Sequence, residues 1–170
     1  GDHVICVATI TERKRVLELA EAAITAKTPL KVVGKPYSEA DPCFLKFVQT
    51  AQASQGVVEY LGPIQNPEQL AARLHAARGF VLPSTMETQS LAALEAAAAG
   101  LPLLLSDLPW AHATFGRKAT YLPLCSRKAF ADHLSRFFDL APGLPEPPKP
   151  QTWMEVAETL TGIYGSTLTG

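Results

Sequence analysis

The chain of 170 residues has a formal net charge of -1, with 47% hydrophobic and 18% charged residues. This composition is typical of one globular domain, and a nearly neutral chain has no overall charge that would attract nucleic acid or an acidic membrane. No apolar stretch approaches the ~20 residues of a membrane span, and the start has no signal-peptide pattern. We therefore expect a cytoplasmic protein whose separate cysteines, Cys6, Cys43 and Cys125, stay reduced.

Short aliphatic runs alternate with longer segments of helical spacing over residues 1–140. In chain order, the predicted strands are 3–10, 30–33, 57–61, 80–82, 103–106 and 120–124. The helices predicted between and after them are 12–26, 42–55, 66–77, 90–99, 110–115 and 126–140. This alternation predicts an α/β fold, a Rossmann-like, doubly wound parallel sheet of about six strands with helices on both faces.

A proline-rich segment follows this domain. Residues 141–150 contain Pro142, Pro145, Pro147, Pro148 and Pro150, which favour an extended, semi-rigid linker. A last helix is predicted within residues 151–170. The sequence thus divides into a domain at 1–140, a linker at 141–150 and a C-terminal helix.

Polar turns follow the predicted strands. In a parallel sheet, ligands bind in the crevice outside the carboxyl ends of the strands. The turns at those ends are 9–14, 34–36, 61–64, 83–90 and 106–109. We therefore expect Thr9, Gly34 and Lys35, in the first two of these turns, to contact a ligand.

The segment 80–107 carries two carboxylates in an E-x7-E spacing, Glu87 and Glu95. Glu87 is predicted in the turn before the helix 90–99, so the two carboxylates would address different ends of one elongated ligand. Ser90 is a natural N-cap for this helix. The next amides would then be free at the positive end of the helix dipole, which is a ready anion site.

This segment resembles the signature of retaining GT-B glycosyltransferases of family 4 (group 1), written as P-S, then E-G, then E-A-x-A-x-G-x-P. The matching positions are Pro83-Ser84, Glu87, Glu95-Ala96, Ala98, Gly100 and Pro102. Residues 58–82 and 152–164 resemble the flanking stretches of the same family. The resemblance implies the C-terminal, donor-binding domain of an enzyme that transfers a sugar from a nucleotide diphosphate sugar with retention.

The resemblance also assigns roles to individual residues. Glu87 matches the glutamate that contacts the hydroxyls of the donor sugar, and Lys14 matches the lysine that neutralises the departing diphosphate. These two are the expected catalytic residues. Glu95 matches the glutamate that binds the ribose hydroxyls. The remaining expected contacts to the nucleotide sugar are Ser84, Thr88, Gln89, Ser90 and Leu91, with Gly62, Pro63 and Ile64 around the base.

Three departures from the family pattern stand out. The family has G-R where this chain has Ala8-Thr9, so an arginine is absent, and Arg13 and Arg15 are the candidates to replace it. Thr88 stands where the family has a glycine, and its Cβ restricts backbone approach to the donor. No acceptor-binding domain precedes Gly1. The chain alone is therefore expected to bind the donor without catalysis, with its last helix packed on the domain or toward the missing one.

Other functions stay open beside this interpretation. One is a degenerate module of the same fold that holds a nucleotide or a partner without turnover. Others are a GT-B sugar epimerase and a dinucleotide-dependent dehydrogenase, although no G-x-G-x-x-G follows the first strand. A P-loop protein is excluded, because the sequence lacks G-x-x-x-x-G-K-[ST].

The sequence predicts no metal site and no cofactor. The four histidines are scattered, and no D-x-D pair is present to hold a metal ion. We expect a nucleotide-sugar donor and the missing acceptor domain as partners, with any membrane contact made through that domain. The base, the sugar and the acceptor are not identified by the sequence, so UDP, GDP and ADP all remain candidates.

Overall fold

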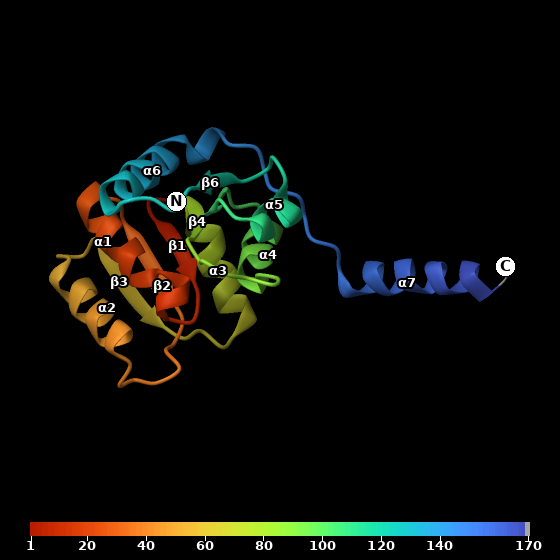
Figure 1. Ribbon diagram of the computed structural model, residues 1–170, viewed down its shortest axis with the longest axis horizontal. Coiled ribbons are helices and arrows are strands. Elements are labelled where there is room, and N and C mark those ends of the chain that lie inside the picture. The colour runs from red at the N-terminus through yellow and green to blue at the C-terminus, as the bar shows by residue number, and fades with distance from the viewer. Residues whose placement is uncertain (169–170) are drawn as a thin grey trace.

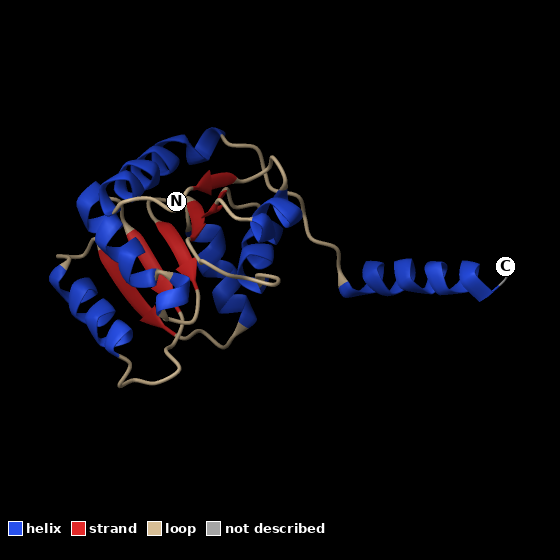
Figure 2. Cartoon of the chain, viewed as in Figure 1, coloured by secondary structure: helices blue, strands red, loops and turns tan. Residues whose placement is uncertain are grey.

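The computed structural model describes residues 1–168, with side-chain environments up to residue 163; the end of the predicted helix 151–170 lies outside the described residues. Six parallel strands form one sheet in the order β3-β2-β1-β4-β5-β6. The strands are β1 (Val4–Val7), β2 (Leu30–Val33), β3 (Val58–Gly62), β4 (Gly79–Leu82), β5 (Leu103–Ser106) and β6 (Thr120–Leu122). The predicted doubly wound α/β fold is confirmed (Figures 1 and 2).

Helices cover both faces of this sheet. They are α1 (Val16–Ala26), α2 (Pro42–Ala53), α3 (Pro67–Ala76), α4 (Leu91–Ala98), α5 (Pro109–Phe115), α6 (Arg127–Leu140) and α7 (Trp153–Leu168). Helix α1 packs between α2 and α6 on one face, whereas α3 and α4 lie side by side on the other. This arrangement follows from right-handed crossovers that run outward in both directions from the centre of the sheet.

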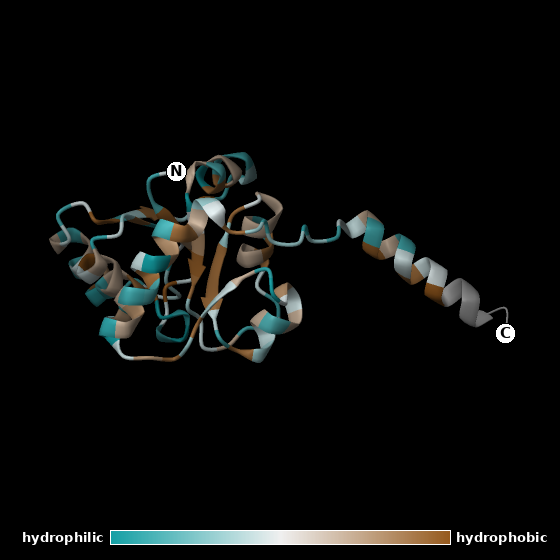
Figure 3. Cartoon of the chain, turned by 90° about the horizontal axis from the view of Figure 1, so that it is seen from above, coloured by the Kyte–Doolittle hydropathy of each residue, from teal (hydrophilic) through white to brown (hydrophobic). Residues whose placement is uncertain are grey.

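The core lies between these layers, along strands that are buried on both sides. All residues of β4 and β5 are buried, as are the first three of β1. Figure 3 shows hydrophobic strands in the middle of the domain and helices that mix hydrophilic and hydrophobic residues. Strands of this kind carry no polar alternation, which is why they appear in the sequence as continuous aliphatic runs. Burial also raises the pKa of the Cys6 thiol to about 12, so this thiol stays protonated and inert.

The helix predicted over residues 12–26 is interrupted, and this corrects the sequence analysis. A 3-10 turn at Glu12–Lys14 ends at Arg15, whose φ of 53° is left-handed, and α1 begins at Val16. The buried Arg15 side chain pairs with Glu18 and lies over the ring of Phe130 on α6, 5.5 Å from its centroid. Packing against a distant helix therefore holds Arg15 in this conformation, and the break directs residues 12–14 toward the carboxyl edge of the sheet.

The C-terminal part also differs from the prediction. Residues Ala141–Gly143 form a 3-10 turn that continues α6, and Ala141 is buried, so the linker is not extended throughout. In Figure 1, α7 extends away from the domain, with Trp153 87% exposed. Its described part therefore does not pack back on residues 1–140. Among the described residues, every helix is too short or too polar to cross a lipid bilayer.

Three strand ends meet closely at Gly34. Its amide donates to the carbonyl of Gly62 at 3.0 Å, and the Tyr60 hydroxyl donates to the carbonyl of Gly34 at 2.9 Å. Gly34 has a φ of 149°, and a Cβ on it would lie 1.8 Å from the carbonyl oxygen of Ala8. Only glycine fits here, because both the space and the backbone conformation exclude a side chain.

Replacing Gly34 with alanine is expected to lower the free energy of unfolding by about 2 kcal/mol or more, because the Cβ forces the ends of β1 and β2 apart. Gly56→Ala is the matched control. Its φ of 89° is also unusual for alanine, but nothing lies within 4 Å of the added Cβ. We expect this control to lose only about 1 kcal/mol. Urea unfolding measures both, and equal losses would contradict the packing argument.

Candidate functional site

A cleft of about 400 Å³ opens at the carboxyl ends of β1, β2 and β3, beside the start of α4. The structure brings most of the predicted residues together along its walls. These are Thr9, Lys14, Gly34, Lys35, Pro63, Ile64, Glu87, Gln89, Ser90 and Leu91. The sequence analysis missed the small and aliphatic residues that complete the lining, which are Val7, Ala8, Val33 and Ala92. Only their positions, at strand ends and in the first turn of a helix, could have predicted that these residues line the cleft.

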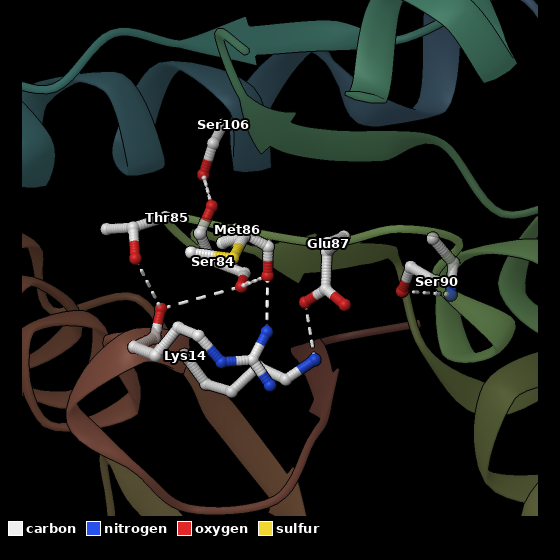
Figure 4. A network of polar contacts seen from close by, with 9 residues as sticks. Lys14, Ser84, Thr85, Met86, Glu87, Ser90 and Ser106 are labelled. Atoms are coloured by element: carbon white, nitrogen blue, oxygen red, sulfur yellow. Dashed lines mark hydrogen bonds and ion pairs between the residues drawn. The ribbon is translucent and has the colours of Figure 1, made fainter. Parts of the chain in front are cut away.

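Two loops that are more than seventy residues apart in sequence form one wall of this cleft. The carbonyl of Arg13 accepts hydrogen bonds from the Thr85 amide at 2.9 Å and from the Thr85 hydroxyl at 3.2 Å. In return, the Arg13 guanidinium donates to the carbonyl of Met86. The turn 11–15 and the loop 84–88 are therefore held together through main-chain groups (Figure 4).

Buried serines support this wall from below. Ser106, at the end of β5, donates its hydroxyl to the carbonyl of Ser84 at 2.7 Å. Ser84 in turn donates to the carbonyl of Met86 at 3.0 Å, and both serines are fully buried. Ser84 therefore lies beneath the loop and does not line the cleft, so its contribution is to hold the loop in place.

The two expected catalytic side chains contact each other directly. The Lys14 ammonium forms an ion pair with the Glu87 carboxylate (Figure 4). The side chains are 13% and 7% exposed, respectively, so solvent screens the pair only weakly. The cleft thus holds a nearly buried cation and anion that neutralise each other.

The start of α4 provides backbone donors beside this pair. Ser90 caps the helix as predicted, with its hydroxyl oxygen accepting from the Ala93 amide at 3.3 Å. Leu91 and Ala92, the first residues of the helix, line the cleft. The first amides of a helix have no partner within it, so this end of α4 is suited to an anion.

Glu95 lies outside the main cleft. It borders a second hollow, of about 300 Å³, between α3 and α4. Because Glu95 is three and four positions after Ala92 and Leu91, it lies on the same face of α4, one turn further on. Pro67, the first residue of α3, borders this second hollow, whereas Pro63 and Ile64, in the connection before it, line the main cleft. Glu95 therefore lies further along α4 than the helix start, which shares the main cleft with Glu87.

Neither Arg13 nor Arg15, the two candidates to replace the missing arginine, lines the cleft. Arg13 uses its guanidinium on the Met86 carbonyl, and Arg15 is turned toward Glu18 and α6. Two further predicted residues do not line the cleft. Gly62 ends β3 with a φ of 70°, and Thr88 is exposed in the loop after Glu87.

Residues 1–139 match the family described as glycosyl transferases group 1. The chain belongs to this family of transferases. A comparison with curated protein sequences gives no match. Among the residues that the structure describes, no group of three or more histidine, cysteine, aspartate or glutamate side chains lies close enough together to hold a metal ion.

Solved structures of other proteins share this fold. The pneumococcal O-GlcNAc transferase GtfA, in complex with UDP and GlcNAc, aligns with a TM-score of 0.71 and 17% identity, covering 99% of this chain and 36% of that one. Sucrose-phosphate synthase from Thermosynechococcus elongatus gives 0.71 and 19%, covering 99% and 46%. The catalytic domain of a cholesterol-alpha-glucosyltransferase from Helicobacter pylori gives 0.67 and 20%, covering 84% and 90%.

These likenesses show a Rossmann-like α/β fold that matches GT-B glycosyltransferase structures. The chain spans about a third of the length of the pneumococcal transferase and less than half of the sucrose-phosphate synthase.

Removing the cap of α4 tests how firmly this helix start is held. Ser90→Ala is expected to lower the free energy of unfolding by about 1 kcal/mol and to speed hydrogen exchange at the Ala93 amide, because that amide loses its acceptor. Ser135→Ala, in the interior of α6, is the control and should be neutral or slightly stabilising, since alanine favours helix. Equal effects of the two substitutions in urea unfolding would argue against the cap.

Proposed function

We propose that this group 1 glycosyltransferase chain is the C-terminal, donor-binding domain of a family 4 enzyme that transfers a sugar from a nucleotide diphosphate sugar with retention. The observation that carries the proposal is the Lys14–Glu87 ion pair beside the start of α4. It puts a cation, unpaired helix amides and a carboxylate in one cleft at the ligand-binding edge of the sheet. A diphosphate sugar offers the complementary groups, namely negative charge followed by hydroxyl donors.

The diphosphate is proposed to bind between Lys14 and the first amides of α4. Transfer of the sugar leaves both bonding electrons on the diphosphate, so the main demand on the protein is to stabilise the charge that develops there. The Lys14 ammonium and the helix dipole both meet this demand without a metal ion. We accordingly propose that the donor binds without a metal or other cofactor.

The rest of the donor is proposed to extend in both directions from the diphosphate. Glu87 accepts hydrogen bonds from the hydroxyls of the sugar, and Glu95, one turn along α4, accepts them from the ribose. Both roles suit ionised carboxylates, which offer acceptor sites and need no proton of their own. The base would lie against Pro63 and Ile64, which line the main cleft on the connection that leads to α3.

Two features support the rest of this assignment. The similar pneumococcal protein was solved with UDP and GlcNAc, which supports UDP as the first nucleotide to test. We further propose that a second domain supplies the acceptor pocket, so that this chain alone binds the donor but does not transfer its sugar. The exposed Trp153 and Met154 on α7 suit packing toward that domain.

One observation favours a second candidate, a module of the same fold that holds a nucleotide without turnover. Arg13 and Arg15 are both engaged elsewhere, and Lys14 is already paired with Glu87. The diphosphate would then meet less positive charge than in enzymes with the G-R sequence. Joining the chain to an acceptor domain and assaying sugar transfer separates the two functions.

Lys14→Ala is expected to weaken binding of UDP and of inorganic pyrophosphate by about tenfold each in calorimetric titration, because both ligands lose the ammonium. Lys128→Ala, at the exposed start of α6, removes the same charge far from the cleft and should change neither affinity. GDP and ADP are titrated in parallel, since the base is not assigned. If the unmodified chain binds none of these nucleotides, the proposed donor site is wrong.

Glu95→Ala is expected to separate the ribose contact from the diphosphate contact. It should weaken UDP about tenfold and leave pyrophosphate unchanged, because pyrophosphate has no ribose hydroxyls to bind. Glu68→Ala, an exposed glutamate in the first turn of α3, is the control for loss of charge in this region. A parallel loss for both ligands would mean that Glu95 acts on the diphosphate or on the fold.

A further inference from the structure

The Lys14–Glu87 ion pair has a consequence for which form of the nucleotide the cleft accepts. We infer that Glu87 makes the cleft discriminate against a free nucleoside diphosphate in favour of the intact sugar nucleotide, because only the sugar replaces the partner that Glu87 loses when Lys14 turns to the diphosphate. This inference rests on the proposed donor site. It assigns to Glu87 a role in specificity beyond its contact to the sugar.

The Lys14–Glu87 ion pair is held firmly in place. The Lys14 and Glu87 side chains are 13% and 7% exposed, so water replaces neither partner easily. The backbones that carry them are joined by the bonds between Arg13 and Thr85 and between Arg13 and Met86. The two charges therefore cannot be separated by moving the loops apart. A diphosphate that recruits Lys14 has to take it from Glu87 by rotation of the side chain.

A free nucleoside diphosphate leaves the Glu87 carboxylate without a partner. A nucleoside diphosphate satisfies Lys14 but leaves a nearly buried carboxylate without its counter-ion and close to two phosphate groups. Losing one member of a buried ion pair is costly, because the other charge stays desolvated. Among the residues that line the cleft, the other basic side chain is Lys35, which is exposed at the end of β2. It offers Glu87 no buried replacement.

The sugar of an intact sugar nucleotide gives Glu87 a new partner. When a sugar is attached to the diphosphate, its hydroxyls donate hydrogen bonds to the Glu87 carboxylate in place of the Lys14 ammonium. Binding then exchanges partners at both charges and leaves neither one unpaired. Once the sugar is gone, Glu87 draws Lys14 back, and the spent nucleotide is held less tightly. The pair thus favours entry of the donor and release of the nucleotide product.

Glu87→Gln tests this inference, because it keeps the size of the side chain and one acceptor oxygen but removes the charge and replaces the other oxygen with an NH2 donor. We expect UDP to bind about fivefold more tightly and UDP-glucose to change less, so that the preference for the sugar nucleotide shrinks. GDP with GDP-mannose is titrated as a second pair. Glu12→Gln is the matched control, since it removes an exposed carboxylate from the same turn as Lys14 and should leave the preference unchanged.

A second background separates the ion pair from simple repulsion between Glu87 and phosphate. In Lys14→Met, the same Glu87→Gln substitution should give a much smaller gain in UDP affinity, because there is no pair left to break. Glu87→Ala, checked by thermal unfolding, has to shift UDP affinity in the same direction as Glu87→Gln.

Several results would overturn the inference while leaving the proposed function intact. For Glu87→Gln, these are unchanged or weaker UDP binding and an equal gain for UDP and UDP-glucose. The others are an equal gain from Glu12→Gln, a full gain in the Lys14→Met background, and an opposite shift of UDP affinity in folded Glu87→Ala. If no nucleotide or sugar nucleotide binds the unmodified, folded chain, the proposed function fails and this inference fails with it.

Discussion

The site depends on the contact between the turn 11–15 and the loop 84–88. Hydrogen bonds to the Arg13 carbonyl, together with the bond from its guanidinium to Met86, fix the distance between these segments. Lys14 and Glu87 project from the two sides of this junction and meet in the cleft. Since the junction uses mostly main-chain groups, it fixes the geometry of the charged pair without depending on side chains that a ligand would need.

Much of the fold was predictable because its signals are local. The fully buried β5, Leu103–Ser106, is a continuous aliphatic run, and the N-caps Asn66 and Ser90 mark the starts of α3 and α4. The break at Arg15 was not predictable. Its cause is burial of the side chain against Phe130, which lies more than a hundred residues later in the chain. Helical periodicity continues through such a position, so it gives no sign of the interruption.

Part of the candidate site was also predictable from local signals. The contacts between distant segments of the chain were not. Lys14 and Glu87 follow from the resemblance to a family motif, and the strand-end rule placed Gly34 and Lys35 at the cleft. The contacts that Arg13 and Arg15 make were not predictable. The acceptor for Arg13 is a main-chain carbonyl, and every residue has one, so no residue type in the sequence marks it. The pairing of Lys14 with Glu87 depends on this same hydrogen bond between Arg13 and Met86, so the sequence does not show it either.

Gly34 lies so close to the Ala8 carbonyl that this part of the cleft cannot accept a side chain. Other positions around the cleft are less constrained. A side chain cannot be added at Gly34 without parting the ends of β1 and β2. Pro63 and Gln89, in contrast, are exposed residues that line the cleft. Substitutions that change the shape of this cleft are therefore expected at Pro63 and Gln89 and not at Gly34.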